Sequence, residues 1–254
     1  MIIIISPAKN LDFSPEVSLP LTKPHLIEQS KTIMSELSQL KPADLEKLMK
    51  ISPKIADLNF ERNQNWSYPF EKFKSKAAAL AFNGEVYSGL NFSNLSQEDQ
   101  EYAQSHLFIL SGLYGILKPL DEIYPYRLEM GTKLGVQNNK NLYEFWNNSI
   151  HQIIDQQLEQ QKSRFLVNLA STEYSKAAKL KDIKLPVITP TFKDNKNGNY
   201  KVIMMYAKKA RGLMTSYIIK NKITDLEELK SFDSDGYVYN ENLSEGNNIT
   251  FTRG

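Results

Sequence analysis

The chain contains no cysteine among its 254 residues, and histidine and tryptophan are scarce. The absence of cysteine excludes disulfides, thiolate metal sites, iron–sulfur clusters and thiol-based redox chemistry. The three histidines, His25, His106 and His151, are scattered and form no HxH or HExxH pattern and no cluster with carboxylates. We therefore expect no stable metal site.

Common nucleotide and hydrolase motifs are also missing. The sequence has no GxGxxG, no P-loop and no GxSxG elbow. Dinucleotide-binding, NTPase and α/β-hydrolase functions thus lose their usual support. We expect the chain to work without a cofactor.

Long hydrophobic runs are absent as well. The N-terminal apolar run in MIIIISPAKN is too short for a signal peptide, has no basic residues before it, and no other window approaches a transmembrane span. Hydrophobic content of 41%, charged content of 24% and a net charge of +2 are typical of a globular protein. We predict a soluble cytoplasmic protein without membrane contact, folded as one domain over residues 1–254.

Strand and helix patterns alternate along the chain. The run Ile2 to Ile5 is typical of a buried central strand, and residues 165–170 predict another. Hairpins are predicted around Asn197-Gly198, joining 187–192 to 200–205, and between 237–240 and 249–252. Residues 77–82 fit a strand or a short helix, and residues 83–90 are rich in turn formers. Helices are predicted at 24–40, 43–50, 53–66, 96–106, 141–161, 172–180, 207–221 and from 224. This pattern predicts an α/β fold of mixed α and β type, with a mixed sheet surrounded by helices.

The span 110–131, LSGLYGILKPLDEIYPYRLEMG, combines turn formers, aromatics and charges. Its glycines and prolines prevent a continuous helix, and such loops tend to carry function. It offers Lys118, Arg127 and Glu129 beside Tyr114, Tyr124 and Tyr126. Two interpretations remain open: a binding loop for an anionic, ring-bearing partner, or a structural loop packed by its own tyrosines.

Two strand ends carry further candidate residues. Ser6 and Lys9 follow the first strand, while Ser171, Thr172 and Lys176 follow the strand at 165–170. Ligand crevices in α/β sheets lie at the carboxyl ends of strands, so these residues are well placed for an anion. Alternatively, the serines cap turns and the lysines are solvated.

A cluster of cations begins the helix predicted at 207–221. Lys208, Lys209 and Arg211 occupy its first turns, which the helix dipole disfavours unless an anion is present. Lys208 and Arg211 share one helical face, and the small residues beside them permit close approach of another backbone. The other possibility is a solvated basic face.

Several long motifs occur together and in order: IIISPAK, LSGLYGILKPLD with PYRLEMG, LYEFW, VNLASTEY and AKKARGLM. On these motifs the chain resembles the YaaA peroxide-stress protein family over nearly its whole length. The resemblance implies an unusual single-domain fold with a helix-hairpin-helix element and a basic cleft. It also implies binding to double-stranded or distorted DNA, and a role in limiting peroxide damage by lowering free intracellular iron. The family often carries ARGLMxR, whereas Ser216 stands at the final position here.

The leading hypothesis is a DNA-binding stress protein in which one groove contacts phosphates and tyrosines stack on bases. Its expected nucleic-acid-binding residues are Lys9, Lys118, Arg127, Lys176, Lys208, Lys209 and Arg211. The alternative is an enzyme acting on a nucleobase or nucleotide. Lys9 would then be a nucleophile or phosphate clamp, with Glu129 as acid or base beside Arg127.

Overall fold

The main sheet is eight-stranded and mixed within the part of the chain that the computed structural model describes, residues 1–14, 20–71 and 74–254. Its order is β11-β12-β9-β8-β1-β5-β6, and β10 pairs with β9. The strands are β1 (Ile2–Ile5), β2 (Asn10–Leu11), β3 (Lys76–Ala77), β4 (Phe82–Asn83), β5 (Leu107–Ser111), β6 (Gly115–Leu117), β7 (Glu122–Ile123), β8 (Leu166–Leu169), β9 (Val187–Lys196), β10 (Asn199–Lys201), β11 (Val238–Tyr239) and β12 (Asn248–Arg253). The helices are α1 (Ile27–Leu37), α2 (Pro42–Met49), α3 (Pro53–Asn65), α4 (Ala78–Ala81), α5 (Glu85–Leu90), α6 (Gln97–His106), α7 (Leu142–Trp146), α8 (Ser149–Gln160), α9 (Thr172–Ala177), α10 (Met204–Asn221) and α11 (Leu226–Lys230). The predicted mixed α/β class is confirmed.

Strand β1 lies at the centre of this sheet. It runs parallel to β5 on one side and to β8 on the other, and its four isoleucines are fully buried. β9 and β12 continue the parallel part, while β6, β10 and β11 join by antiparallel pairing. The prediction of a buried central strand from four β-branched residues is therefore confirmed.

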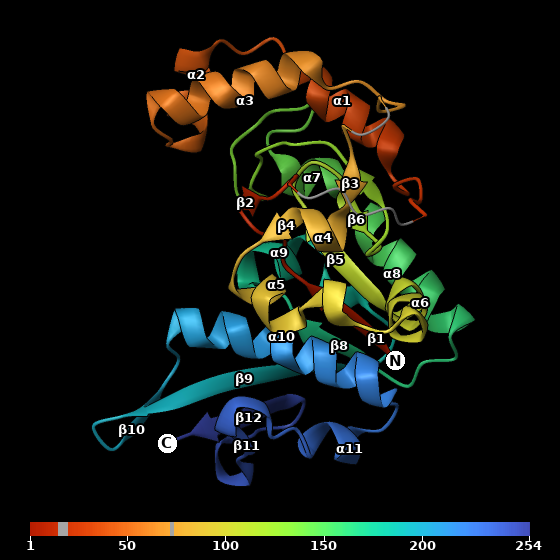
Figure 1. Cartoon of the computed structure of the whole chain (residues 1–254), viewed down its shortest axis with the longest axis vertical. Coiled ribbons are helices and arrows are strands. Elements are labelled where there is room, and N and C mark those ends of the chain that lie inside the picture. The colour runs from red at the N-terminus through yellow and green to blue at the C-terminus, as the bar shows by residue number, and fades with distance from the viewer. Residues whose placement is uncertain (15–19, 72–73) are drawn as a thin grey trace.

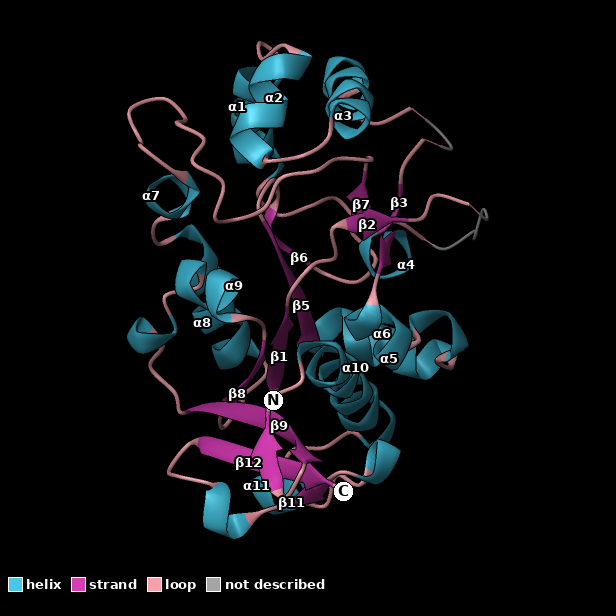
Figure 2. Cartoon of the chain, turned by 90° about the vertical axis from the view of Figure 1, so that its left-hand side faces the viewer, coloured by secondary structure: helices cyan, strands magenta, loops and turns pink. Residues whose placement is uncertain are grey.

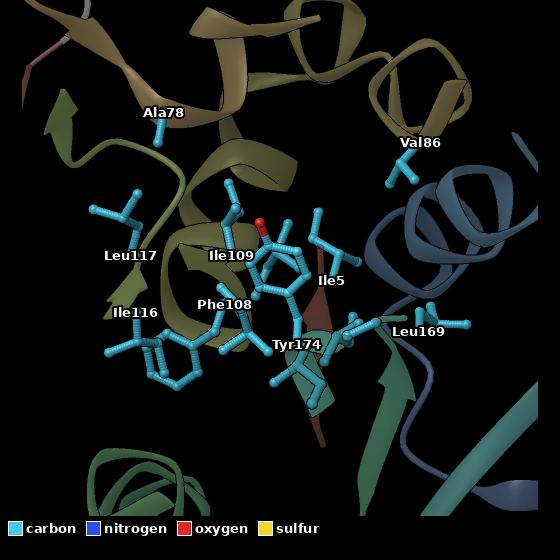
Figure 3. Packing of buried hydrophobic residues seen from close by; sticks show 14 of the residues in the cluster. Ile5, Ala78, Val86, Phe108, Ile109, Ile116, Leu117, Leu169 and Tyr174 are labelled. Atoms are coloured by element: carbon cyan, nitrogen blue, oxygen red, sulfur yellow. The ribbon is translucent and has the colours of Figure 1, made fainter. Parts of the chain in front are cut away.

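Helices cover both faces of the sheet. Figure 2 shows α8 and α9 on one side of β1 and β5, and α5, α6 and α10 on the other. Helices α1 to α3 form one end of the molecule, and β11, β12 and α11 form the opposite end (Figure 1). Figure 3 shows Ile5, Ile109 and Leu169, from β1, β5 and β8, in the apolar core between these layers.

Two glycines allow α5 and α10 to pack backbone against backbone. A Cβ atom on Gly212 would lie 1.9 Å from the carbonyl oxygen of Val86, and one on Gly89 would lie 2.3 Å from that of Lys209. Any side chain at either position would overlap the neighbouring helix. This close crossing fixes the start of α10 beside the loop that precedes α5.

The structure changes three predicted elements. The single helix predicted at 141–161 is wrong: it divides into α7 and α8 at Asn147, where φ is +38°. The apolar spacing continues across the break because Leu142 and Trp146 of α7 and Ile150 of α8 are all buried in the core. The segment 83–90, predicted as turn-rich, contains α5, and the strand predicted at 200–205 ends at Lys201 before α10 begins at Met204.

Other local predictions agree with the structure. Asn197 and Gly198 both have positive φ and join β9 to β10, as a tight hairpin requires. β11 and β12 also pair antiparallel as expected. Among the described helices, none combines the length and apolar character needed to cross a membrane.

Candidate functional site

A cavity of about 550 Å³ opens where β1 and β8 end. Its wall includes the loop after β1, the start of α5, the span 126–129, the start of α9 and the first turns of α10. The predicted site residues that line it are Lys9, Arg127, Lys208 and Arg211. Four cations from three distant segments of the sequence are thus brought to one concavity.

The two strand ends meet at this cavity, as the parallel arrangement predicts. The backbone N–H of Ser171 donates to Oγ of Ser6 at 2.8 Å, and the two hydroxyl oxygens lie 3.2 Å apart. The hydroxyl of Tyr87, from α5, donates to the carbonyl oxygen of Ser6 at 3.0 Å. These hydrogen bonds connect the segments that follow β1 and β8 to each other and to α5 in the wall of the cavity.

Glu129 joins two of the cations. Lys9 Nζ lies 2.7 Å from Glu129 Oε2, and Arg127 donates to Glu129 Oε1 at 3.3 Å. Lys9 keeps 63% of its side chain exposed, whereas Arg127 keeps only 18%. The Nε of Arg127 is buried and has no hydrogen-bond partner within the described residues. The guanidinium therefore has one unsatisfied donor, which lies beneath the accessible surface.

Helix α10 supplies the remaining cations of the wall. Lys208 and Arg211 line the cavity while Lys209 does not, as their helical spacing predicts. Burial lowers the pKa of Arg211, but an arginine side chain remains charged in proteins. No carboxylate in residues 1–14, 20–71 or 74–254 lies within ion-pair distance of either side chain. Both cations are available to an anion.

Tyrosines form the apolar part of the wall. Tyr87, Tyr126 and Tyr174 line the cavity, and burial raises the pKa of each phenol, so all three are neutral at pH 7. Tyr114 is fully buried instead: its hydroxyl accepts from Trp66 Nε1 and from the N–H of Tyr124. The expectation that Tyr114 is free to stack on a base is wrong, because it belongs to the core.

The other predicted cations lie outside the cavity. Lys118 borders a separate hollow of about 180 Å³ that also contains Asp121. The Lys176 ammonium lies 4.7 Å from the ring centre of Tyr143, and Lys209 lies 3.6 Å from the Asp235 carboxylate. Ser216, at the position where the family pattern has arginine, is buried and does not line the cavity.

Sequence reasoning missed the acidic residues of the cavity wall, Glu85 and Glu173. The Glu173 carboxylate accepts from the N–H of Gly131 at 2.8 Å and so joins α9 to the end of the span 110–131. The signal available in the sequence was the position of Glu173 directly after a strand end. Its partner is 42 residues away, and no local pattern indicates that contact.

The arrangement is suited to binding an anion. Lys9 and Arg127 pair with one shared carboxylate, two cations of α10 have none within ion-pair distance in the described residues, and neutral, largely buried tyrosines line the rest of the wall. In the part of the chain described here, no group of three or more histidine, aspartate or glutamate side chains is placed to hold a metal ion.

Comparison with known proteins shows the family of the chain. Residues 1–243 match the family described as peroxide stress protein YaaA. A UPF0246 protein of Saccharophagus degradans is 51% identical over 254 residues, covering 100% of this chain and 99% of its own. A UPF0246 protein of Clostridium beijerinckii is 50% identical over 258 residues, covering 100% of this chain and 98% of its own. The chain belongs to the peroxide stress protein YaaA family.

Proposed function

We propose that this chain acts in peroxide stress as a DNA-binding protein and that the cavity is part of a basic cleft that holds the DNA backbone. The observation that carries the proposal is the convergence of Lys9, Arg127, Lys208 and Arg211 on one concavity. Backbone phosphates are the anions that such a group of cations contacts without reading sequence.

The size of the cavity limits how much of the DNA can enter it. A volume of about 550 Å³ lies within the range of about 300–1,000 Å³ typical of small-ligand sites, so it accommodates a nucleotide but not a duplex. A duplex would lie across the opening, with one backbone segment reaching inside. Lys118, Lys176 and Lys209, which lie elsewhere, would then contact phosphates farther along the DNA or none.

Helices α2 and α3 are our candidate for the helix-hairpin-helix element that the resemblance implies. They are consecutive, pack together at one end of the molecule, and are joined only by residues 50–52 (Figure 1). Lys50 adopts the left-handed conformation that ends α2, and Pro53 begins α3. Exposed Lys47, Lys50 and Lys54 would give this element its phosphate contacts.

Binding across a salt series tests the DNA proposal. Affinity for a short fluorescent duplex should fall steeply with salt, and Lys9→Ala/Lys208→Ala should reduce the slope of log affinity against log salt by roughly two. The matched control is Lys181→Ala, an exposed lysine outside the cavity, which should leave the slope unchanged. Salt-independent binding, or equal slopes for both variants, would contradict the proposal.

The proposed role in iron is tested in cells. If this chain limits peroxide damage by lowering free intracellular iron, then deleting its gene should raise the free-iron signal in whole-cell electron paramagnetic resonance under peroxide. Returning the wild-type gene should lower the free-iron signal to the level of the parent strain. Returning the Lys9→Ala/Lys208→Ala variant should leave the signal raised. An unchanged signal in the deletion strain would contradict this role.

A second candidate function is an enzyme acting on a nucleobase or nucleotide. The observation that favours it is the Lys9–Glu129–Arg127 chain, in which a carboxylate lies between an exposed amine and a half-buried guanidinium inside a concave wall. Incubating the protein with nucleotides and with DNA, followed by mass spectrometry, tests it. A product formed by the wild type but not by Glu129→Gln would favour the enzyme. Unchanged substrates would count against it.

A further inference from the structure

Exposed apolar side chains are concentrated beside the cavity. Tyr200, Val202, Met204, Met205 and Tyr206 are 40%, 45%, 59%, 54% and 40% exposed, and all fall between β10 and the first turn of α10. Such a group is unusual on a protein surface and marks an interaction site. Met204 also lines the cavity, so the apolar surface continues into the candidate site.

The apolar group is carried on a firmly held support. The hairpin of β9 and β10 extends away from the body of the molecule, and the start of α10 lies beside it (Figure 1). The hydroxyl of Tyr200 donates to the carbonyl oxygen of Gly254, and the Arg253 guanidinium stacks 4.9 Å from the ring centre of Tyr206. Both tyrosines are thereby tied to the C-terminal strand. The side chains of Met204 and Met205 remain to contact a partner.

The charge around these methionines indicates what the partner is. Between residues 193 and 211 the basic residues are Lys193, Lys196, Lys201, Lys208, Lys209 and Arg211. The acidic residue in that stretch, Asp194, is already engaged by Arg253 and Tyr237. An exposed apolar group with basic residues before and after it in the sequence complements a partner that carries regular negative charge on its surface and apolar groups in its interior. Double-stranded DNA has both, in its phosphates and its base stack.

We propose that Met204 and Met205 form a wedge that enters an opened base step of DNA whose backbone is held at the cavity. This inference rests on the proposed DNA binding and adds to it two residues that would enter the DNA, Met204 and Met205. Apolar side chains that enter a base step unstack it at a cost of a few kcal/mol and kink the duplex. DNA that already contains an opened step avoids that cost and should bind more tightly.

The test compares an intact duplex with the same duplex carrying a bulge, each with 2-aminopurine at the candidate step. The wild type should bind the bulged DNA about tenfold more tightly and should raise 2-aminopurine fluorescence in the intact duplex. Met204→Gln/Met205→Gln keeps side-chain length and every cation. It should lose both effects while the salt slope stays near the wild-type value.

The matched control is Leu243→Gln, which replaces a side chain that is 40% exposed between β11 and β12, outside the cavity wall and outside α2 and α3. It should behave as the wild type. Retention of both the bulge preference and the fluorescence change in the methionine double variant would overturn the wedge and leave the DNA proposal standing. Absence of salt-sensitive binding by the wild type would refute the DNA proposal itself. If the wild type sediments as a dimer and the methionine double variant sediments as a monomer, the surface would be assigned to contact with a second copy of the chain.

Discussion

Two regions of this molecule surround an arginine with carboxylates and aromatic rings, yet they pair their charges differently. In the C-terminal cluster, Arg253 donates through Nε to Asp194 at 2.7 Å and through Nη1 to Asp235 at 2.7 Å. Its guanidinium also lies between the rings of Tyr206 and Tyr237. In the cavity, Arg127 has one ion pair at 3.3 Å, and its Nε has no partner in the described residues.

The Arg253 cluster is a structural ion pair. The cavity differs because two of the cations that line it have no carboxylate within ion-pair distance in the described residues. Arg253, which keeps 23% of its side chain exposed, holds β12 to β9 by pairing with the buried carboxylate of Asp194. In our proposal, an incoming phosphate pairs with Lys208 and Arg211, which line the cavity and have no carboxylate within ion-pair distance in the described residues. We therefore base the proposal that the cavity is the functional region on this incomplete pairing, more than on the presence of basic residues.

The largest expected effect comes from breaking the complete cluster. Arg253→Met should lower the free energy of unfolding by about 3–5 kcal/mol, because it leaves the Asp194 carboxylate buried without its cation. Urea denaturation measures this change. Arg164→Met, which removes an ion pair of an 80% exposed arginine, is the matched control and should cost under about 0.5 kcal/mol. Equal losses in the two variants would contradict the structural role of Arg253.

A smaller effect is expected when the same cluster keeps its cation but loses a neutral donor. The hydroxyl of Tyr237 donates to Asp194 Oδ2 at 2.9 Å in a buried setting. Tyr237→Phe should therefore cost about 2 kcal/mol, the usual range for a hydrogen bond to a charged group. Tyr200→Phe removes an exposed hydroxyl and should be nearly neutral. If Tyr237→Phe has the free energy of unfolding of the wild type, Arg253 alone satisfies the Asp194 carboxylate.

Asp121 extends the comparison to a buried carboxylate with no ion pair in the described ranges. It accepts from the Thr22 hydroxyl at 2.6 Å and from the N–H of Lys118 at 2.8 Å, and burial raises its pKa to about 6. Because the folded pKa lies above the unfolded value near 3.8, protonation favours the folded state as pH falls.

The wild-type free energy of unfolding, taken relative to Asp121→Asn, should therefore rise by about 1.4 kcal/mol between pH 7 and pH 5. Denaturation of both proteins at each pH measures this difference, and titrations shared by the two proteins cancel. A difference that stays constant, or that falls toward pH 5, would contradict the raised pKa.

The smallest effect on stability is expected at the cavity. Lys9→Ala/Lys208→Ala should change the free energy of unfolding by no more than about 0.5 kcal/mol, because these side chains are exposed and the Lys9–Glu129 pair is solvated. Thermal denaturation checks this. A loss of several kcal/mol would place these lysines with Arg253 as structural residues.

Sequence predicted the elements whose cause is local. Four β-branched residues indicated β1, Asn197-Gly198 indicated the β9–β10 hairpin, and spacing separated Lys208 and Arg211 from Lys209. Ser6 and Ser171 were each predicted to follow a strand end, and both line the cavity, where they contact each other.

Features caused by distant partners were not predictable. Helix α5 forms where turn residues suggested a loop because Gly89 packs against α10. The break at Asn147 is accompanied by hydrogen bonds from Lys179 to Asn147 and Asn148, made across more than thirty residues. The Glu173–Gly131 contact likewise joins segments that no periodicity relates.

The most direct test of the central claim is ultraviolet crosslinking of the wild-type protein to a short duplex, with the crosslinked peptides identified by mass spectrometry. The account predicts crosslinks on the cavity wall, in residues 126–129 and at Met204 to Arg211, that disappear at high salt. Crosslinks confined to surfaces away from the cavity, such as the hollow beside Lys118, would contradict it.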